Sequence, residues 1–358
     1  MFEGSAKQMT WHKHGHRYHP DKMVHPSDGE AWKAFDMEYK DFSREARNVR
    51  VPIATDGFNP FGMGAASYSC WPVFVIPLNL PPGVCMQRQN ILLSLIIPGH
   101  EYPGKNMSVY IDPLVDELMV AWEKGILTYD RATKQNFTMR VAYHTSLHDL
   151  PAYGLFCGWC VHGKMPCPVC RETLRCIWLK KGGKFSFFDL HRQFLPTDHE
   201  FRNDPNGFRT GVVVHSESPP RLTCQQVLDQ LKALKPSPDG KGFVGYGEEH
   251  NWTHVPGLWR LPYFHKLLLP HNIDVMHNEK NVAEAIFSTI FDIPEKTKDN
   301  VKARVDQQAL CNRPALNMHH NVTKDKWEKP RASYCLNRAQ KREILEWFQE
   351  LKFPDGYA

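Results

Sequence analysis

Short apolar runs bounded by proline, glycine and asparagine recur along the first third of the chain. They occupy residues 50–55, 71–76 and 91–97, and their length and bounding residues are typical of β-strands. The runs 71–76 and 91–97 are almost entirely apolar, so we expect both to be buried strands. Because no helical pattern separates the three runs, they predict a meander of three strands.

Two other segments carry apolar residues at the spacing of an amphipathic helix. The first covers residues 30–39 and follows a Pro-Ser-Asp start. The second begins at Asp112, has Pro113 in the first helical position, and ends at Gly125. Beyond it, the pattern predicts a fourth strand at 137–143.

One aspartate follows the first strand and another follows the fourth. Asp56 closes the run 50–55, where Gly57 and an Asn-Pro pair prevent the strand from continuing, and Asp149 comes shortly after 137–143. This order of strands, helix and acids is that of the ribonuclease-H-like α/β fold. There the first and fourth strands are neighbours, and their carboxylates hold Mg²⁺ or Mn²⁺, hard ions that prefer oxygen ligands. Each aspartate alone is also typical of a turn or a helix cap.

The remainder of the chain departs from this pattern. Residues 154–260 are rich in glycine, proline, lysine and cysteine and are interpreted as an insertion. A fifth strand is predicted at 263–269 and a helix at 279–291. The pattern therefore predicts five segments. They are an N-terminal polar and helical segment (1–49), the first part of the core (50–153), the insertion (154–260), the rest of the core (261–294) and a charged helical C-terminal segment (295–358).

Composition narrows the class of protein. With 42% hydrophobic and 23% charged residues, the chain is expected to be globular rather than disordered. No stretch approaches about 20 apolar residues, so neither a transmembrane helix nor a membrane partner is expected. A net charge of +5 permits nucleic-acid binding without requiring it. The polar N-terminus indicates an intracellular protein, in which ten cysteines favour metal binding or free thiols over disulfides.

A Cys-x-x-Cys pair is the strongest metal signal in the insertion. The spacing of Cys167 and Cys170 lets two thiolates share one tetrahedral zinc ion, and His191 and His199 offer two imidazoles downstream. We expect these four residues to form a structural zinc site. Two alternatives stay open, namely a Cys₄ site that includes the Cys-Gly-Trp-Cys string at 157–160, and ordinary thiols without a metal.

The chain contains several unusual short sequence motifs. Two of them are Ala-Thr-Asp-Gly-Phe-Asn-Pro-Phe and His-Asn-Ile-Asp-Val-Met-His-Asn-Glu-Lys-Asn. The positions of all the motifs are 54–61, 69–73, 133–138, 167–170, 271–281 and 296–300. Together they strongly resemble the transposases of plant CACTA (En/Spm-type) DNA transposons. The resemblance runs from about residue 11 to residue 358, and the length of the strings makes it highly specific.

The resemblance implies a cut-and-paste enzyme whose ribonuclease-H-like domain carries a DDE triad. Such an enzyme uses Mg²⁺ or Mn²⁺ to cleave phosphodiesters and transfer strands at transposon ends. Asp56 would be the first acid and Asp149 the second. Asp274 and His277 match the [C/D]xxH motif that related transposases place after the fifth strand, which makes Asp274 a rival for the second acid. His277 would lie near the scissile phosphate or, alternatively, bond to the backbone at a helix start.

Partners and compartment also follow from the resemblance. It implies binding to DNA at the transposon terminal repeats, cooperation with a second element-encoded DNA-binding protein, assembly into homo-oligomers and a nuclear location.

The chain differs from the family in several features. Members are usually longer, and their third acid, a glutamate on a late helix, is expected beyond the end of this chain. Glu279, Glu284 and Glu343 do not stand in that context. Relatives carry a Ser-Gly-Trp-Ser string where this chain has cysteines at 157–160. We therefore expect a truncated copy that is inactive by itself. The alternative is a domesticated, zinc-containing DNA-binding or interaction protein without catalysis.

Overall fold

The computed structural model describes residues 3–61, 68–99, 102–187, 192–208, 211–240 and 242–352. The chain divides into two units. The first comprises Met1–Glu172 and Pro220–Asp274, and the second comprises Thr173–Pro219 and Val275–Ala358. The five segments expected from the sequence do not follow this division, because residues 1–49 and all of 220–260 belong with the strands of the first unit.

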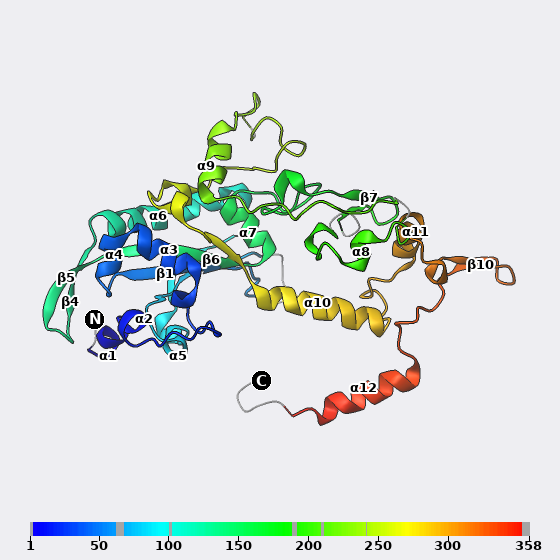
Figure 1. Ribbon diagram of the computed structural model, residues 1–358, viewed down its shortest axis with the longest axis horizontal. Coiled ribbons are helices and arrows are strands. Elements are labelled where there is room, and N and C mark those ends of the chain that lie inside the picture. Colours follow the sequence, from blue (N-terminus) through cyan, green and yellow to red (C-terminus); the bar gives the residue numbers. More distant parts are fainter. Residues whose placement is uncertain are drawn as a thin grey trace. The chain divides into compact units, whose positions relative to one another are not determined.

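In the part of the chain that the structure describes, five strands form a mixed sheet at the centre of the first unit (Figure 1). In spatial order they are β3 (Leu92–Ile97), β2 (Trp71–Val75), β1 (Val49–Thr55), β6 (Val141–His148) and β9 (His271–Ile273). β1, β2 and β3 pair antiparallel, so the predicted meander is confirmed. β6 runs parallel to β1, and β9 runs parallel to β6. The expected adjacency of the first and fourth strands is therefore present, and the unit is a mixed α/β structure.

Helices pack against the sheet, and its central strand β1 is buried along almost its whole length. Val51 and Ile53 of β1 are buried in a core of apolar side chains, to which the predicted helix near residue 30 contributes Phe35. Burying a side chain of this size stabilises the folded state by about 1.5–3 kcal/mol, so these contacts hold the strands against the helices. The helices of this unit are α1 (Glu3–Gln8), α2 (Trp11–His14), α3 (Glu30–Glu38), α4 (Lys40–Arg44), α5 (Pro82–Cys85), α6 (Met107–Glu123), α7 (Leu150–Cys157) and α9 (Cys224–Ala233).

A proline interrupts the central pairing. The register between β1 and β6 shifts between Val51 and Pro52, which face Tyr143 and Thr145, so His144 lies opposite no residue of β1. Pro52 has no N–H to donate, and a bulge beside it accommodates the lost bond. The bulged His144 is buried, which places an imidazole inside the core.

The fourth strand predicted at 137–143 is wrong, because it merges two separate elements. Gln135–Met139 (β5) pairs with Ile126–Asp130 (β4) in a hairpin, and β6 begins only at Val141. Lys134, with a φ of 54°, adopts the left-handed conformation in the hairpin turn. The predicted run 137–143 therefore spans the end of β5 and the start of β6, which are separated only by Arg140.

The predicted fifth strand at 263–269 is wrong. Phe264–Lys266 forms a 3₁₀ turn. Tyr263, Phe264 and Leu267 are buried on one side, at helical rather than alternating spacing. The fifth strand is β9, which is short and polar.

The predicted burial of β3 and the predicted start of α6 are also wrong. β3 is the edge strand of the sheet, and the side chains of Leu92, Leu93 and Ile96 are exposed. α6 begins at Met107 and contains Pro113 in its interior. Burial of apolar residues such as Met107 in the added turns outweighs the hydrogen bond that the proline cannot donate.

Buried arginines hold much of the second unit together. Arg202 is 1% exposed and donates to four main-chain carbonyls, and Arg304 forms a buried ion pair with Asp299. A guanidinium carries five N–H donors, so one side chain can fix several loops. The elements of this unit are β7 (Ile177–Leu179), β8 (Lys184–Ser186), α8 (Glu200–Asn203), α10 (Val275–Ile290), α11 (Val301–Leu310), β10 (His319–Asn321), β11 (Lys326–Glu328) and α12 (Arg338–Glu350).

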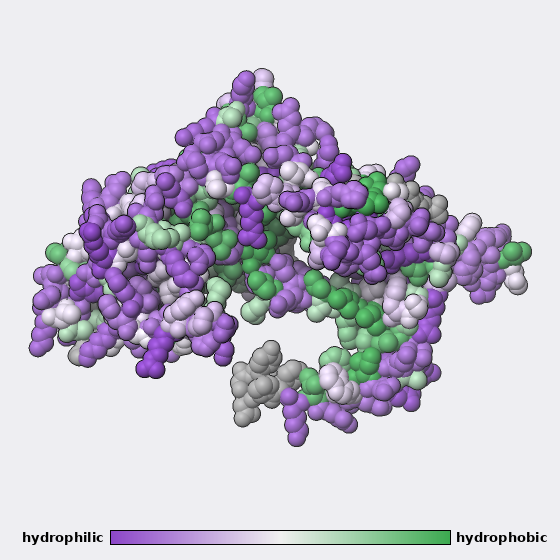
Figure 2. Space-filling view, in the orientation of Figure 1, coloured by the Kyte–Doolittle hydropathy of each residue, from purple (hydrophilic) through white to green (hydrophobic). Residues whose placement is uncertain are grey.

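α10 begins four residues before the predicted helix at 279. Its apolar residues Val282 and Ile286 are exposed, and Figure 2 shows apolar side chains along this helix.

Every helix among the described residues is too short or too polar to cross a membrane.

Candidate active site at the strand ends

Two of the predicted acids stand side by side where parallel strands end. Asp56 is the first residue after β1, and Asp149 is the first residue after β6. The register pairs Ala54 with Leu147, so continuing both strands by two residues brings Asp56 opposite Asp149. Neighbouring strands lie about 4.8 Å apart, and the two carboxylates therefore share one edge of the sheet.

A third aspartate extends this row. Asp274 follows β9, and its N–H donates to the carbonyl of His148 at 2.7 Å. Because Ile273 pairs with His148, the next residues along, Asp274 and Asp149, are neighbours. The structure thus brings together both rivals for the second acid, with Asp149 in the middle of the row.

Asp149 also begins a helix. It is the N-cap of α7, and its Oδ1 accepts a hydrogen bond from the N–H of Ala152 at 2.8 Å. A helix N-terminus favours negative charge because its first N–H groups point outward. The cap reading of Asp149 is therefore correct. A carboxylate has two oxygens, so a cap is compatible with a second ligand.

A buried histidine joins the two central strands just before the acids. The Nδ1 of His148 lies 3.3 Å from the carbonyl of Thr55, the last residue of β1, and its ring packs against Phe156 at 4.2 Å between centroids. Burial lowers the pKa of His148 to about 4, so the ring is neutral at pH 7. A carbonyl only accepts, so this nitrogen carries the proton and donates it. The contact fixes the strand ends from which Asp56 and Asp149 project.

The aspartates suit a hard cation by their chemistry. Asp56 is exposed, Asp149 and Asp274 are half-buried, and carboxylate oxygens are the ligands that Mg²⁺ and Mn²⁺ prefer. Within the described residues, however, no three histidine, cysteine, aspartate or glutamate side chains are placed so that they could hold a metal ion. The backbone therefore aligns the acids, whereas the side chains would have to turn toward one another to share an ion.

The predicted residue His277 and the glutamates considered for the third acid belong to the second unit. His277 lies in the first turn of α10, three residues after Asp274 along the chain. Glu279 and Glu284 are exposed on the same helix, and Glu343 is exposed on α12.

Half of the predicted zinc ligands lie together. The N–H of Cys170 donates to the sulfur of Cys167 at 3.3 Å, and hydrogen bonding with the Cys170 side chain lowers the pKa of Cys167 to about 6. His199 is part of the second unit, where its Nδ1 accepts from the N–H of Phe201 at 3.1 Å. His191 lies outside the described residues. The Cys₂His₂ site therefore stays a prediction.

The alternative Cys₄ site gains little support from the second cysteine pair. Within the described residues, these cysteines do not belong to a group of three or more side chains that could hold a metal ion. The Cys157 thiol contacts the carbonyl of Gly154 at 3.7 Å, and Cys160 contacts the carbonyl of His162 at 3.9 Å.

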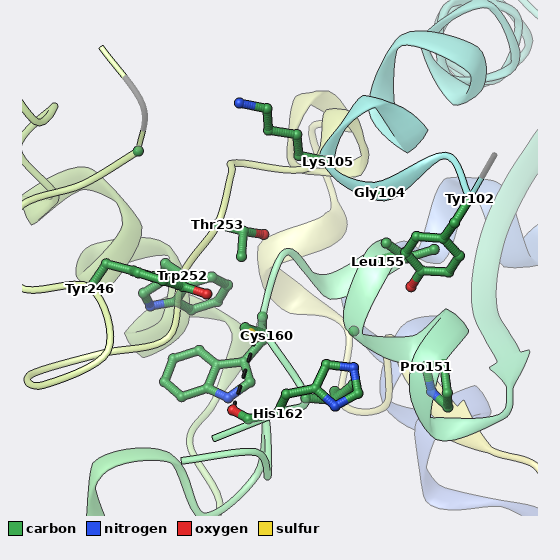
Figure 3. A pocket seen from close by; sticks show the side chains of 14 residues that line it. Tyr102, Gly104, Lys105, Pro151, Leu155, Cys160, His162, Tyr246, Trp252 and Thr253 are labelled. Carbon is green, nitrogen blue, oxygen red and sulfur yellow. Dashed lines mark hydrogen bonds between the residues drawn. The ribbon is translucent and has the colours of Figure 1, made fainter. Parts of the chain in front are cut away.

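A cavity of about 400 Å³ opens beside α7 in the first unit (Figure 3). Pro151 and Leu155 of α7 line it on one side, close to Tyr102, and Tyr246 and Trp252 line it from a separate loop. This cavity was not predicted from the sequence. The signals that could have indicated exposed aromatic rings on tight turns are a glycine-rich run with aromatic residues at 242–247 and the Tyr-Pro-Gly string at 102–104.

Comparison with known proteins gives a family. A family model described as "Transposase family tnp2" matches residues 20–234, more than half of the 358-residue chain. The matched segment contains Asp56, Asp149 and the Cys167–Cys170 pair, whereas Asp274 lies beyond it. Searches of curated proteins and of solved structures each found no match.

Proposed function

Because the chain belongs to the transposase family tnp2, we propose that its first unit is the catalytic core of a cut-and-paste DNA transposase of the CACTA (En/Spm) type. The reaction is metal-dependent cleavage of phosphodiesters at transposon ends, followed by strand transfer. The observation that carries the proposal is the row formed by Asp56, Asp149 and Asp274 at the ends of three adjacent parallel strands.

The order and direction of the strands support a ribonuclease-H-like assignment for this unit. An antiparallel meander, β1 to β3, precedes helix α6, and the later strands β6 and β9 are added in parallel beside β1. In this interpretation, the β4–β5 hairpin is an insertion between α6 and β6. Ligands bind beyond the carboxyl ends of parallel strands in open α/β sheets, which is where the aspartates lie.

The residues have separate tasks in this proposal. Asp56, Asp149 and Asp274 would hold the divalent cation, which when bound supplies Lewis-acid activation of the phosphodiester and of the attacking oxygen. His148 keeps the ends of β1 and β6 together, and the N-terminus of α7 orients Asp149 through the cap. His277 would act near the scissile phosphate.

Further parts of the proposal rest on the resemblance. They are a structural zinc ion on Cys167, Cys170, His191 and His199, recognition of the terminal repeats, a second element-encoded DNA-binding partner, homo-oligomers and a nuclear location. Glu279, Glu284 and Glu343 do not stand in the context of the third acid. We therefore predict that this chain alone does not complete strand transfer, and the test uses a partial reaction.

The test is Mn²⁺-dependent nicking of supercoiled plasmid DNA under a large excess of protein. We expect the wild-type chain to nick slowly and Asp56→Asn to show only the background seen without Mn²⁺. Asp41→Asn is the matched control, because Asp41 is an exposed aspartate of α4 whose ion pair with Arg44 lies on the surface. Nicking that persists in Asp56→Asn would contradict the proposal.

A second function is supported by the close Cys167–Cys170 pair. It is also supported by the described carboxylates at the strand ends, whose side chains are not placed so that they could hold a metal ion together. In this alternative, the chain is a domesticated, zinc-containing DNA-binding protein without catalysis. Binding to DNA that weakens with salt, persists in Asp56→Asn and is never accompanied by nicking would favour it.

A further inference from the structure

We propose that the cavity beside α7 binds a single unstacked nucleobase of the DNA substrate. The inference rests on the proposed function, because it takes the row of aspartates as the place where DNA is cut. The cavity, its lining residues and their orientation are shown in Figure 3.

The position of the cavity links it to the proposed cleavage site. Pro151, in the first turn of α7, lines the cavity, and the N-cap of the same helix is Asp149. On the other side, the exposed ring of Tyr102 lines the cavity. The cavity therefore begins within the first turn of the helix that the proposed ligand Asp149 caps.

The shape and surface suit a flat aromatic ring. A volume of about 400 Å³ lies within the range of small-ligand sites and accommodates a base. Tyr102 and Tyr246 are 52% and 49% exposed, so their rings are available for stacking. Beneath them, Trp159 and Trp252 form a buried T-shaped pair, with centroids 5.2 Å apart, that gives the cavity a rigid floor.

The charges around the cavity suit a polyanion. Among the described residues that line it, none is acidic, whereas Lys105 and His162 are exposed basic side chains. The lining itself therefore presents no carboxylate to a DNA backbone, and the exposed Glu248 and Glu249 of the Tyr246 loop stand outside it. This arrangement favours a nucleotide over a neutral aromatic ligand.

Two hydroxyl groups of the cavity, those of Thr253 and Tyr246, are engaged by the protein itself. The hydroxyl of Thr253 donates to the carbonyl of Gly158 at 3.1 Å. Hydrogen bonding with the Cys160 side chain raises the pKa of Tyr246 to about 12, so this hydroxyl stays protonated. Stacking accepts every base, so we expect little base preference.

The experiment measures binding of a fluorescein-labelled single-stranded oligothymidylate by anisotropy at fixed salt. Loss of one stacking partner predicts that Tyr246→Ala binds about fivefold or more weakly than wild type. Tyr246→Phe keeps the ring and should bind within about twofold of wild type. Tyr129→Ala is the matched control, because Tyr129 is 50% exposed but lies on β4 away from the cavity lining.

Two results overturn the inference. One is wild-type affinity in Tyr246→Ala, and the other is an equal loss in Tyr129→Ala, which would reveal a general effect of surface aromatics. Mn²⁺ binding, measured on the same variants, separates this result from the proposed function. Tyr246→Ala should leave the affinity for Mn²⁺ unchanged. If Asp56→Asn also leaves this affinity unchanged, the proposed metal site is contradicted, whatever the oligonucleotide data show.

Discussion

At the scale of single residues, Asp149 combines a cap with a proposed metal ligand, and substitutions can separate the two roles. Asparagine caps a helix about as well as aspartate but lacks the charge, whereas alanine does neither. We expect Asp149→Ala to lower the free energy of unfolding by about 1 kcal/mol relative to Asp149→Asn, because only alanine loses the bond to the N–H of Ala152. Urea titration followed by circular dichroism measures this difference.

The same pair of variants should behave alike in metal binding. Both remove the negative charge, so both should weaken Mn²⁺ binding. Equal stability of the two variants would contradict the capping role, and wild-type Mn²⁺ binding in Asp149→Asn would contradict the role as a ligand.

The acids differ in how far the sequence alone could identify them. Asp56 and Asp149 were predicted because each follows an apolar strand. Asp274 follows a three-residue strand with a polar centre, so no alternation of apolar and polar residues marked this strand. It was proposed as an acid only because of the resemblance to a transposase family. Tyr102 and Tyr246 were missed, because they lie far apart in the sequence and only the folded first unit brings them to one cavity.

At the scale of elements, α7 is the part that connects the acids to the cavity, and a glycine ends it. Gly158 has a φ of 76°, and a Cβ at this position would lie 2.4 Å from the carbonyl oxygen of His254. Gly163 has a similar φ of 81° but open space around it. The two positions share the same backbone conformation and differ in crowding.

This difference predicts unequal costs of alanine substitution. Positive φ alone should destabilise both Gly158→Ala and Gly163→Ala by about 1 kcal/mol. The clash with a main-chain oxygen should add about 1–3 kcal/mol in Gly158→Ala. Thermal unfolding checks the prediction, and equal melting temperatures for the two variants would show that the turn after α7 relaxes freely.

Element prediction succeeded where one pattern covered a whole element. The helix near residue 30 and the first three strands were found, because their apolar residues keep one period. The fourth strand was misplaced, since β5 and β6 follow each other with only Arg140 between them, and the predicted run 137–143 joined the end of one to the start of the other. The prediction of the fifth strand was wrong because Tyr263, Phe264 and Leu267 pack into the core from a 3₁₀ turn. A buried turn of this kind produces a run of apolar residues in the sequence, as a buried strand does.

At the scale of the whole molecule, buried histidines make stability depend on pH. Burial lowers the pKa of His12, His144 and His148 to about 4, and that of His271 to about 3. Between pH 6.5 and 4 the unfolded chain therefore binds protons that the folded chain does not. Their contribution to stability is complete above about pH 6.5 and is lost as the pH falls toward 4.

We expect the free energy of unfolding to fall steeply between pH 6.5 and 4.5. Each histidine contributes up to about 1.4 kcal/mol per pH unit in this window. Urea unfolding at a series of pH values measures the slope. A free energy that stays constant from pH 7 to pH 5 would mean that these rings are not buried neutral in the folded protein.

The overall architecture was predictable in part. The adjacency of the first and fourth strands followed from the order of elements, whereas the division into two units did not. The boundary at Asp274 and Val275 falls between a strand and a helix that follow each other directly, with no linker composition to mark it. Buried arginines such as Arg202 also hold the second unit together, and polar residues of this kind resemble an exposed face in the sequence.

The central claim is that Asp56, Asp149 and Asp274 form one site for a divalent cation. The most direct measurement is titration with Mn²⁺, followed by electron paramagnetic resonance of the free ion, on wild type and on the asparagine variants of these residues. The account predicts that each variant weakens binding by about tenfold or more, because each removes a charged oxygen ligand, while Asp41→Asn binds like wild type. Equal binding by all variants would contradict the account.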